Sequence, residues 1–205
     1  MAVTLDMRAS ELLTARLCHD LAGPIAAIGN GAELLDDEDP DFVRQASALI
    51  ADSAAIASKR LQLFRFVYGF SAAVIAGPPP QVLASEYFAG TNIACDYPAS
   101  ASQLEPQWQR LGCNLLLIAA EGLPRGGKVT LLSDAGAVCV KAFGEGEGPS
   151  AENIAALTLQ APVAELTSRS VGGYFAGLLA QKLGCRLRVA AEPGGFRIAC
   201  EAGEA

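Results

Sequence analysis

The 205-residue sequence predicts an α+β fold, with an N-terminal antiparallel helical hairpin followed by a C-terminal α/β-sandwich domain. Apolar residues recur at helical spacing along two long N-terminal segments. Beyond them, apolar and polar residues alternate in short runs typical of strands, between shorter helical stretches. Gly77-Pro78-Pro79-Pro80 separates the two patterns. We therefore expect two domains, residues 1–76 and residues 77–205.

The N-terminal half predicts two long helices, over residues 8–36 and 42–70, with Asp39 or Asp41 as the N-cap of the second. The short turn between them makes the helices antiparallel neighbours. A hairpin with broad apolar faces needs either its own second domain or a second copy to cover them. A homodimer that forms a four-helix bundle is the economical arrangement. The stripe of the first helix consists of Leu13, Leu17, Leu21, Ile25, Ile28, Ala32 and Leu35.

The C-terminal half predicts a mixture of strands and helices. Its expected strands cover residues 92–97, 128–133, 137–142, 186–190 and 196–200, of which the last four form two hairpins. Its expected helices cover residues 104–122 and 173–183, with a loop and a short helix over 150–165.

Composition excludes several classes of function. The net charge of −7 argues against a general nucleic-acid binder, which needs basic patches. There is neither a basic-then-apolar signal segment nor an apolar run of the ~20 residues that span a bilayer, so we expect a soluble cytoplasmic protein without a membrane partner. The six cysteines form no C-x-x-C pair, and one histidine cannot complete the usual Cys/His zinc sets.

The only histidine, His19, is the principal candidate for chemistry. At about 100° per residue, it projects roughly opposite the apolar stripe of its helix. Small residues share that outward face, and Pro24 interrupts the backbone hydrogen bonds of the helix beside it. Either His19 is a functional side chain that a partner can approach closely, or it is an exposed histidine beside a packing kink. A dyad with Cys18 is disfavoured because adjacent helical side chains do not face each other.

The segment from His19 to Leu35 resembles the phospho-acceptor helix of sensor histidine kinases, where an acidic residue and Leu follow the histidine and a proline comes soon after. Residues 114–129, 138–146 and 170–179 resemble, in the same order, the boxes of the kinase ATP-binding domain. However, Ile118 stands where an Asn helps to hold Mg-ATP, and Ala142 stands where an Asp reads the adenine. A nucleotide site altered in this way should not bind ATP usefully.

An intact histidine beside a degenerate nucleotide site is similar to the ChpT-type bacterial histidine phosphotransferases. That resemblance implies a homodimer that carries phosphoryl groups between receiver domains, with a C-terminal domain like the kinase ATP-binding domain. The donor would be the receiver of a hybrid histidine kinase, and the acceptors would be response regulators. The chain itself would need no cofactor, since Mg²⁺ would be held by the receiver. Two alternatives stay open: an ATP-dependent kinase fragment, and a scaffold that binds receivers without accepting phosphate.

The resemblance assigns catalytic roles to His19 as nucleophile and to Asp20 as the group that orients the imidazole or accepts its proton. Asp20 is alternatively a solvated acid. The expected partner-docking residues are Arg16, Ala22, Gly23, Ala26 and Asn30. Arg16 is alternatively a solubilising arginine, and Asn30 ordinary surface. The glycines retained from the nucleotide boxes either line a residual pocket or serve tight turns; they are Gly144, Gly146, Gly172 and Gly173.

Overall fold

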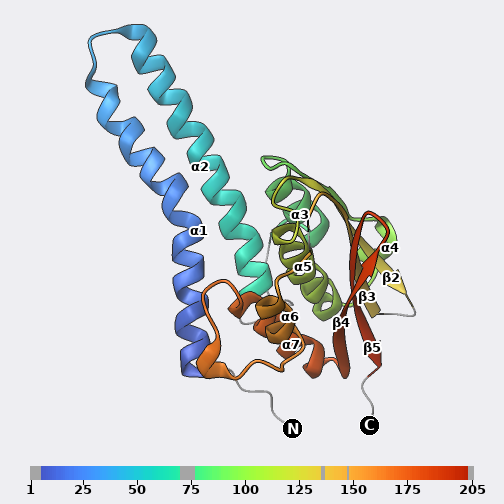
Figure 1. Ribbon diagram of the computed structural model, residues 1–205. Coiled ribbons are helices and arrows are strands. Elements are labelled where there is room, and N and C mark those ends of the chain that lie inside the picture. The colour runs from blue at the N-terminus through green and yellow to red at the C-terminus, as the bar shows by residue number, and fades with distance from the viewer. Residues whose placement is uncertain (1–5, 70–76, 135–136, 147, 203–205) are drawn as a thin grey trace.

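The computed structural model describes residues 6–69, 77–134, 137–146 and 148–202. Two long helices, α1 (Met7–Glu33) and α2 (Pro40–Tyr68), form an antiparallel hairpin whose far end projects away from the rest of the molecule (Figure 1). The predicted hairpin is therefore confirmed, with a 3₁₀ turn η1 (Leu34–Asp36) in place of the last predicted turn of the first helix. Asp39 is the N-cap of α2, and its carboxylate accepts the Asp41 N–H at 2.9 Å. Residues 70–76, where we expected α2 to end and the first domain to close, lie outside the described residues.

The C-terminal half contains a five-stranded sheet of order β1-β2-β3-β5-β4. β1 pairs with β2 in parallel, and the other pairs are antiparallel. The strands are β1 (Ile93–Asp96), β2 (Gly127–Asp134), β3 (Ala137–Gly144), β4 (Cys185–Glu192) and β5 (Gly195–Ala202). Both predicted hairpins are confirmed, although turn residues 135–136 of the first lie outside the described part of the chain.

Helices cover one face of this sheet, which gives the predicted α/β sandwich (Figure 1). α5 packs on β2 and β3, and α7 packs on β4. The helices of this half are α3 (Pro80–Phe88), α4 (Ala99–Ser102), α5 (Pro106–Glu121), α6 (Ala151–Leu157) and α7 (Val171–Lys182), with a 3₁₀ turn η2 (Val163–Glu165). The fold class is therefore α+β, as the sequence predicts.

The helix α3 was not predicted, because no periodic pattern marks residues 80–88. The run of prolines before it indicates a break in structure, yet Pro80 occupies the first turn, where its missing N–H costs nothing. The buried side of α3 consists of Leu83, Ala84 and Phe88. Nine residues supply too few apolar repeats for a strong periodic signal.

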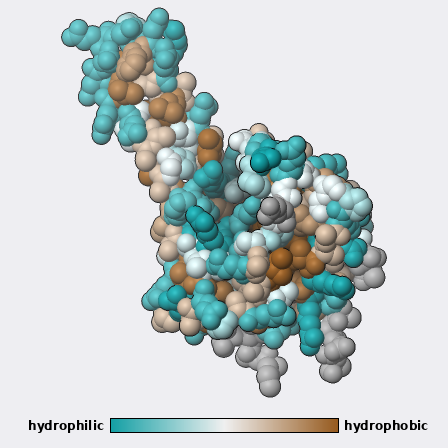
Figure 2. Space-filling model, in the orientation of Figure 1, coloured by the Kyte–Doolittle hydropathy of each residue, from teal (hydrophilic) through white to brown (hydrophobic). Residues whose placement is uncertain are grey.

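The main hydrophobic core lies between the sheet and its helices, and the C-terminal end of α2 extends into it through Leu63, Phe64, Phe66 and Val67. The projecting end of the hairpin, in contrast, exposes large apolar side chains, which form brown patches in Figure 2. They include Ile25, Leu34, Leu35, Phe42, Leu49 and Ile56. Among the described residues, no helix combines the length and apolarity that crossing a membrane requires.

Candidate functional site

His19 lies on the outward face of α1, where 88% of its side chain is exposed. The structure thus places the ring where the helical spacing predicts. A cavity of about 580 Å³ opens beside it, between α1 and the segment that leads into α7. Its walls come from both halves of the chain: Ala15, Arg16, His19, Asp20, Glu121, Asn153, Ser168 and Arg169. An exposed imidazole at the rim of a polar cavity is accessible to the reacting group of another molecule.

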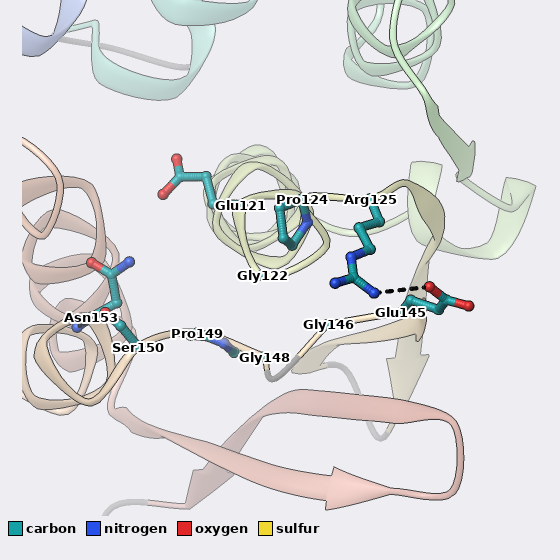
Figure 3. Close-up of a pocket in the computed structure, with 10 residues that line it drawn as sticks. All are labelled: Glu121, Gly122, Pro124, Arg125, Glu145, Gly146, Gly148, Pro149, Ser150 and Asn153. Atoms are coloured by element: carbon teal, nitrogen blue, oxygen red, sulfur yellow. Dashed lines mark hydrogen bonds and ion pairs between the residues drawn. The ribbon is translucent and has the colours of Figure 1, made fainter.

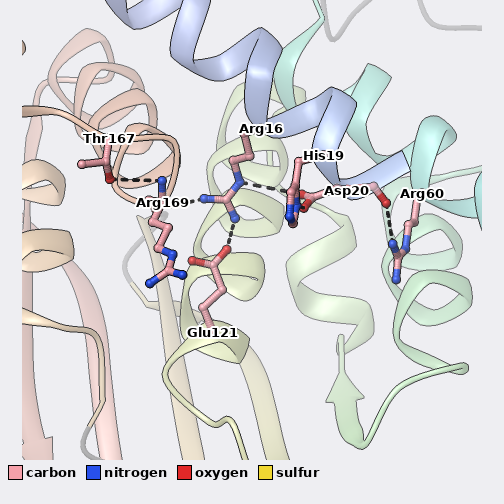
Figure 4. A network of polar contacts seen from close by, with 7 residues as sticks. All are labelled: Arg16, His19, Asp20, Arg60, Glu121, Thr167 and Arg169. Carbon is pink, nitrogen blue, oxygen red and sulfur yellow. Dashed lines mark hydrogen bonds and ion pairs between the residues drawn. The ribbon is translucent and has the colours of Figure 1, made fainter. Parts of the chain in front are cut away.

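Asp20 contacts the imidazole of His19, with its Oδ1 3.3 Å from Nδ1. This is a long hydrogen bond, and it favours the tautomer that carries a proton on Nδ1. The other ring nitrogen, Nε2, then keeps its lone pair for nucleophilic attack. The second carboxylate oxygen of Asp20 lies 3.9 Å from Nε of Arg16. In Figure 4 the carboxylate of Asp20 thus lies between the imidazole of His19 and the guanidinium of Arg16, one turn earlier in α1.

Arg16 does not lie on the outward face with the other predicted docking residues. Its side chain is only 15% exposed and pairs with the carboxylate of Glu121 at the end of α5. It also donates to the carbonyl of Arg169 at 3.0 Å (Figure 4). Burial by itself would lower the pKa of Arg16, but Glu121 and the neighbouring groups raise it above the usual value. The solubilising alternative is therefore wrong, and the contacts of Arg16 are with this chain itself.

The junction around Arg16 is closely packed. A Cβ on Gly172 would lie 3.0 Å from Nη1 of Arg16, so this glycine leaves room for the guanidinium. The ring of Tyr68, at the end of α2, packs edge-on against Phe175 of α7 with centroids 5.3 Å apart. Burial raises the pKa of Tyr68 to about 12, so its hydroxyl stays neutral. The base of the hairpin thus contacts the C-terminal half of the chain through packing as well as through charge.

The remaining predicted docking residues are exposed on α1: Ala22, Gly23, Ala26 and Asn30. A Cβ on Gly23 would meet no atom within 4 Å, which shows that the surface next to His19 is open. Their exposure agrees with a docking face, but their contact with a partner stays a prediction.

The pocket that corresponds to the nucleotide site of the resemblance has a volume of about 790 Å³ (Figure 3). In the wall of this pocket, the backbones of Gly146 and Gly122 lie so close together that a Cβ on Gly146 would clash with the carbonyl oxygen of Gly122. Ile118 and Ala142 are both buried in the core, away from solvent. On the pocket wall, Arg125 pairs with Glu145 at 3.3 Å. The charged side chains of the lining are two carboxylates and one arginine, and the arginine is already paired with one of the carboxylates. Carboxylates repel a triphosphate, so this lining is a poor match for one.

Within the described residues, no group of three or more His, Cys, Asp or Glu side chains is arranged to hold a metal ion.

Sequence reasoning missed three residues that shape the site, namely Arg60, Glu121 and Arg169. Each comes from another element and meets α1 only in the folded chain (Figure 4). Only one signal pointed to any of them: Pro24 deprives the Asp20 carbonyl of its helical donor, so another donor must take its place.

A family model, a curated relative and a solved structure to which this chain is similar are all phosphotransferases. Residues 80–195 match the family model of the histidine phosphotransferase C-terminal domain. The protein phosphotransferase ChpT of Brucella abortus is 36% identical over 123 residues, a match that covers 58% of each chain. A solved structure of a bacterial phosphotransferase superposes with a TM-score of 0.77 at 29% identity, over 97% of this chain and 98% of that one. The sequence match thus reaches little more than half the length of the curated relative, whereas the structural match spans nearly the whole chain.

Proposed function

Because the chain belongs to the histidine phosphotransferase family, we propose that His19 accepts a phosphoryl group from a receiver-domain aspartate and passes it to the aspartate of a second receiver. The observation that carries this proposal is the exposed imidazole of His19, with Asp20 on Nδ1 and Nε2 left for attack. The donor would be the receiver of a hybrid histidine kinase, and the acceptors would be response regulators.

The transfer needs little from the protein beyond position and charge compensation. Nε2 attacks the phosphorus of the aspartyl phosphate, an N–P bond forms, and the P–O bond to the aspartate breaks. The ring becomes positively charged as the bond forms, and the carboxylate of Asp20 next to Nδ1–H stabilises that charge. Reversal of these steps delivers the phosphoryl group to the second receiver. Mg²⁺ bound by the receiver would neutralise the phosphoryl oxygens.

The receiver would dock on the outward face of α1, around Ala22, Gly23, Ala26 and Asn30. The small side chains of Ala22, Gly23 and Ala26 would let another backbone approach the imidazole closely. The cavity beside His19 has its opposite wall in the second domain, at Ser168 and Arg169. A docked receiver would therefore meet both halves of the chain.

The second domain would support docking without binding ATP. Ile118 and Ala142 are buried and apolar, so they offer no ligand for Mg²⁺ or adenine. This distinguishes the proposal from an ATP-dependent kinase fragment.

A homodimer would cover the exposed apolar side chains of the projecting hairpin. Phe42, Leu49 and Ile56 recur every seven residues along α2 and lie on one face of it, and Ile25 of α1 is 57% exposed. Pairing with a second hairpin would bury these side chains in a four-helix bundle.

The test is phosphoryl transfer to the purified chain. One reaction contains the receiver domain of a hybrid histidine kinase carrying radiolabelled aspartyl phosphate, and a second contains radiolabelled ATP alone. We expect acid-labile label from the receiver only, lost in His19→Ala and retained in Cys18→Ala, which changes the adjacent exposed residue. Label from ATP alone would make the chain a kinase. A receiver that binds but transfers no label would make it a scaffold.

A further inference from the structure

Pro24 leaves one backbone carbonyl of α1 without its usual partner. In an α-helix, the carbonyl of residue 20 accepts the N–H of residue 24, and proline has no N–H. The helix nevertheless continues without a break from Met7 to Glu33. The carbonyl in question belongs to Asp20, the residue whose carboxylate contacts His19.

Arg60 of α2 supplies the missing donor. Its Nη1 donates to the carbonyl oxygen of Asp20 at 2.5 Å, across 40 residues of sequence (Figure 4). Because the guanidinium is charged, this hydrogen bond is stronger than one between two neutral groups. The Arg60 side chain is half-buried between the helices, where competition from water is reduced.

Resting on the proposed phosphotransfer, we propose that Arg60 is a positioning residue for His19. It fixes the backbone of Asp20, whose carbonyl has no helical donor because of Pro24, and the carboxylate of Asp20 in turn orients the imidazole. The donor that Pro24 lacks is thus replaced by Arg60, through which α2 supports the residue next to the nucleophile. Arg60 touches neither the phosphoryl group nor the imidazole in this scheme.

A double-mutant cycle tests the coupling, since Pro24→Ala restores an N–H that can bond the Asp20 carbonyl within the helix. The four chains are the unchanged protein, Arg60→Gln, Pro24→Ala and the double variant. The rate of label transfer from the phosphorylated receiver to His19 is measured for each, per folded protein. We expect Arg60→Gln to lower kcat between about 10- and 100-fold with KM unchanged, the scale of a misplaced reacting group. The same substitution in the Pro24→Ala background should change kcat less than about twofold.

Two further variants separate positioning from general effects. Arg60→Lys keeps a cationic donor and should recover part of the rate, whereas Lys59→Gln removes the adjacent positive charge and should leave the rate unchanged. A rise in KM with unchanged kcat in Arg60→Gln would overturn the inference, because Arg60 would then be a docking residue. Equal losses in the two backgrounds would also overturn it. If the unchanged chain accepts no label, both the proposed function and this inference are wrong. If the unchanged chain accepts label and Arg60→Gln is equally active, the proposed function stands and only the inference is wrong.

Discussion

The guanidinium of Arg16 in α1 pairs with the carboxylate of Glu121 at the C-terminal end of α5. Arg16 lies three residues before His19, and Glu121 lies at the meeting point of the nucleotide-like pocket and the cavity beside His19. The pair therefore links the C-terminal half of the chain to α1 close to the proposed phospho-acceptor. It joins the two halves of the chain on the side where a receiver would dock.

Breaking this pair should loosen the two halves. We expect Glu121→Gln to lower the free energy of unfolding by about 1–2 kcal/mol, between the values for exposed and buried pairs, since Arg16 is left largely buried without its carboxylate. Transfer from the receiver should slow more than labelling by phosphoramidate, a small donor that needs no docking surface. Urea denaturation and the two labelling rates measure these effects.

Two variants control that experiment. Glu145→Gln breaks the exposed pair with Arg125 and should change stability by less than about 0.5 kcal/mol. Exchange of the charges in Arg16→Glu/Glu121→Arg should recover part of the lost stability. Equal effects of Glu121→Gln and Glu145→Gln would show that the Arg16 pair does not hold the halves together.

Restoring the acid that the resemblance places at residue 142 should not create a nucleotide site. Ala142 is fully buried on β3, so we expect Ala142→Asp to place an unpaired carboxylate in the core and cost about 3 kcal/mol without creating ATP affinity. The neutral Ala142→Val adds similar volume and should cost only about 1–2 kcal/mol. Thermal denaturation and titration with ATP measure the two outcomes. ATP binding by a stable Ala142→Asp variant would show that the pocket retains a nucleotide-binding arrangement.

The fold was largely predictable because its elements follow simple periodicities. The helical stripe from Leu13 to Leu35 predicted α1, and the alternation on either side of Asp134 and of Pro193 predicted the two hairpins. The α3 helix was missed because proline reads as a break although it also begins helices.

The site was predictable only where its residues are neighbours in sequence. The exposure of His19 follows from helical geometry, and Asp20 comes next in the chain. The contacts of Arg60 and Glu121 with α1 depend on how distant elements pack, which no local pattern encodes. For the same reason Arg16 was expected to contact a partner, whereas its long side chain reaches Glu121 in the C-terminal half of the chain.

The proposed dimer depends on the apolar face of the hairpin. Leu49 and Ile56 are exposed on one face of α2, so Leu49→Lys/Ile56→Lys should place charges in the dimer interface. We expect the mass from light scattering to fall from two chains to one, with helical circular dichroism retained. Ala51→Lys, on the opposite face of α2, should leave the mass unchanged. A monomeric mass for the unchanged chain would contradict the dimer directly.

Gly23 should separate the stability of α1 from access to His19. It lies inside the helix, and a Cβ at this position would have no neighbour within 4 Å, so Gly23→Ala should raise the free energy of unfolding by about 0.5–1 kcal/mol. Gly29→Ala, equally open, should give the same gain. If Gly23 belongs to the docking face, the larger Gly23→Leu should slow transfer from the receiver at least about tenfold, a loss of about 1.4 kcal/mol, yet leave labelling by phosphoramidate unchanged. If the receiver transfers equally well to Gly23→Leu, it must approach His19 from another side. Its contacts would then be expected at the cavity wall formed by Ser168 and Arg169.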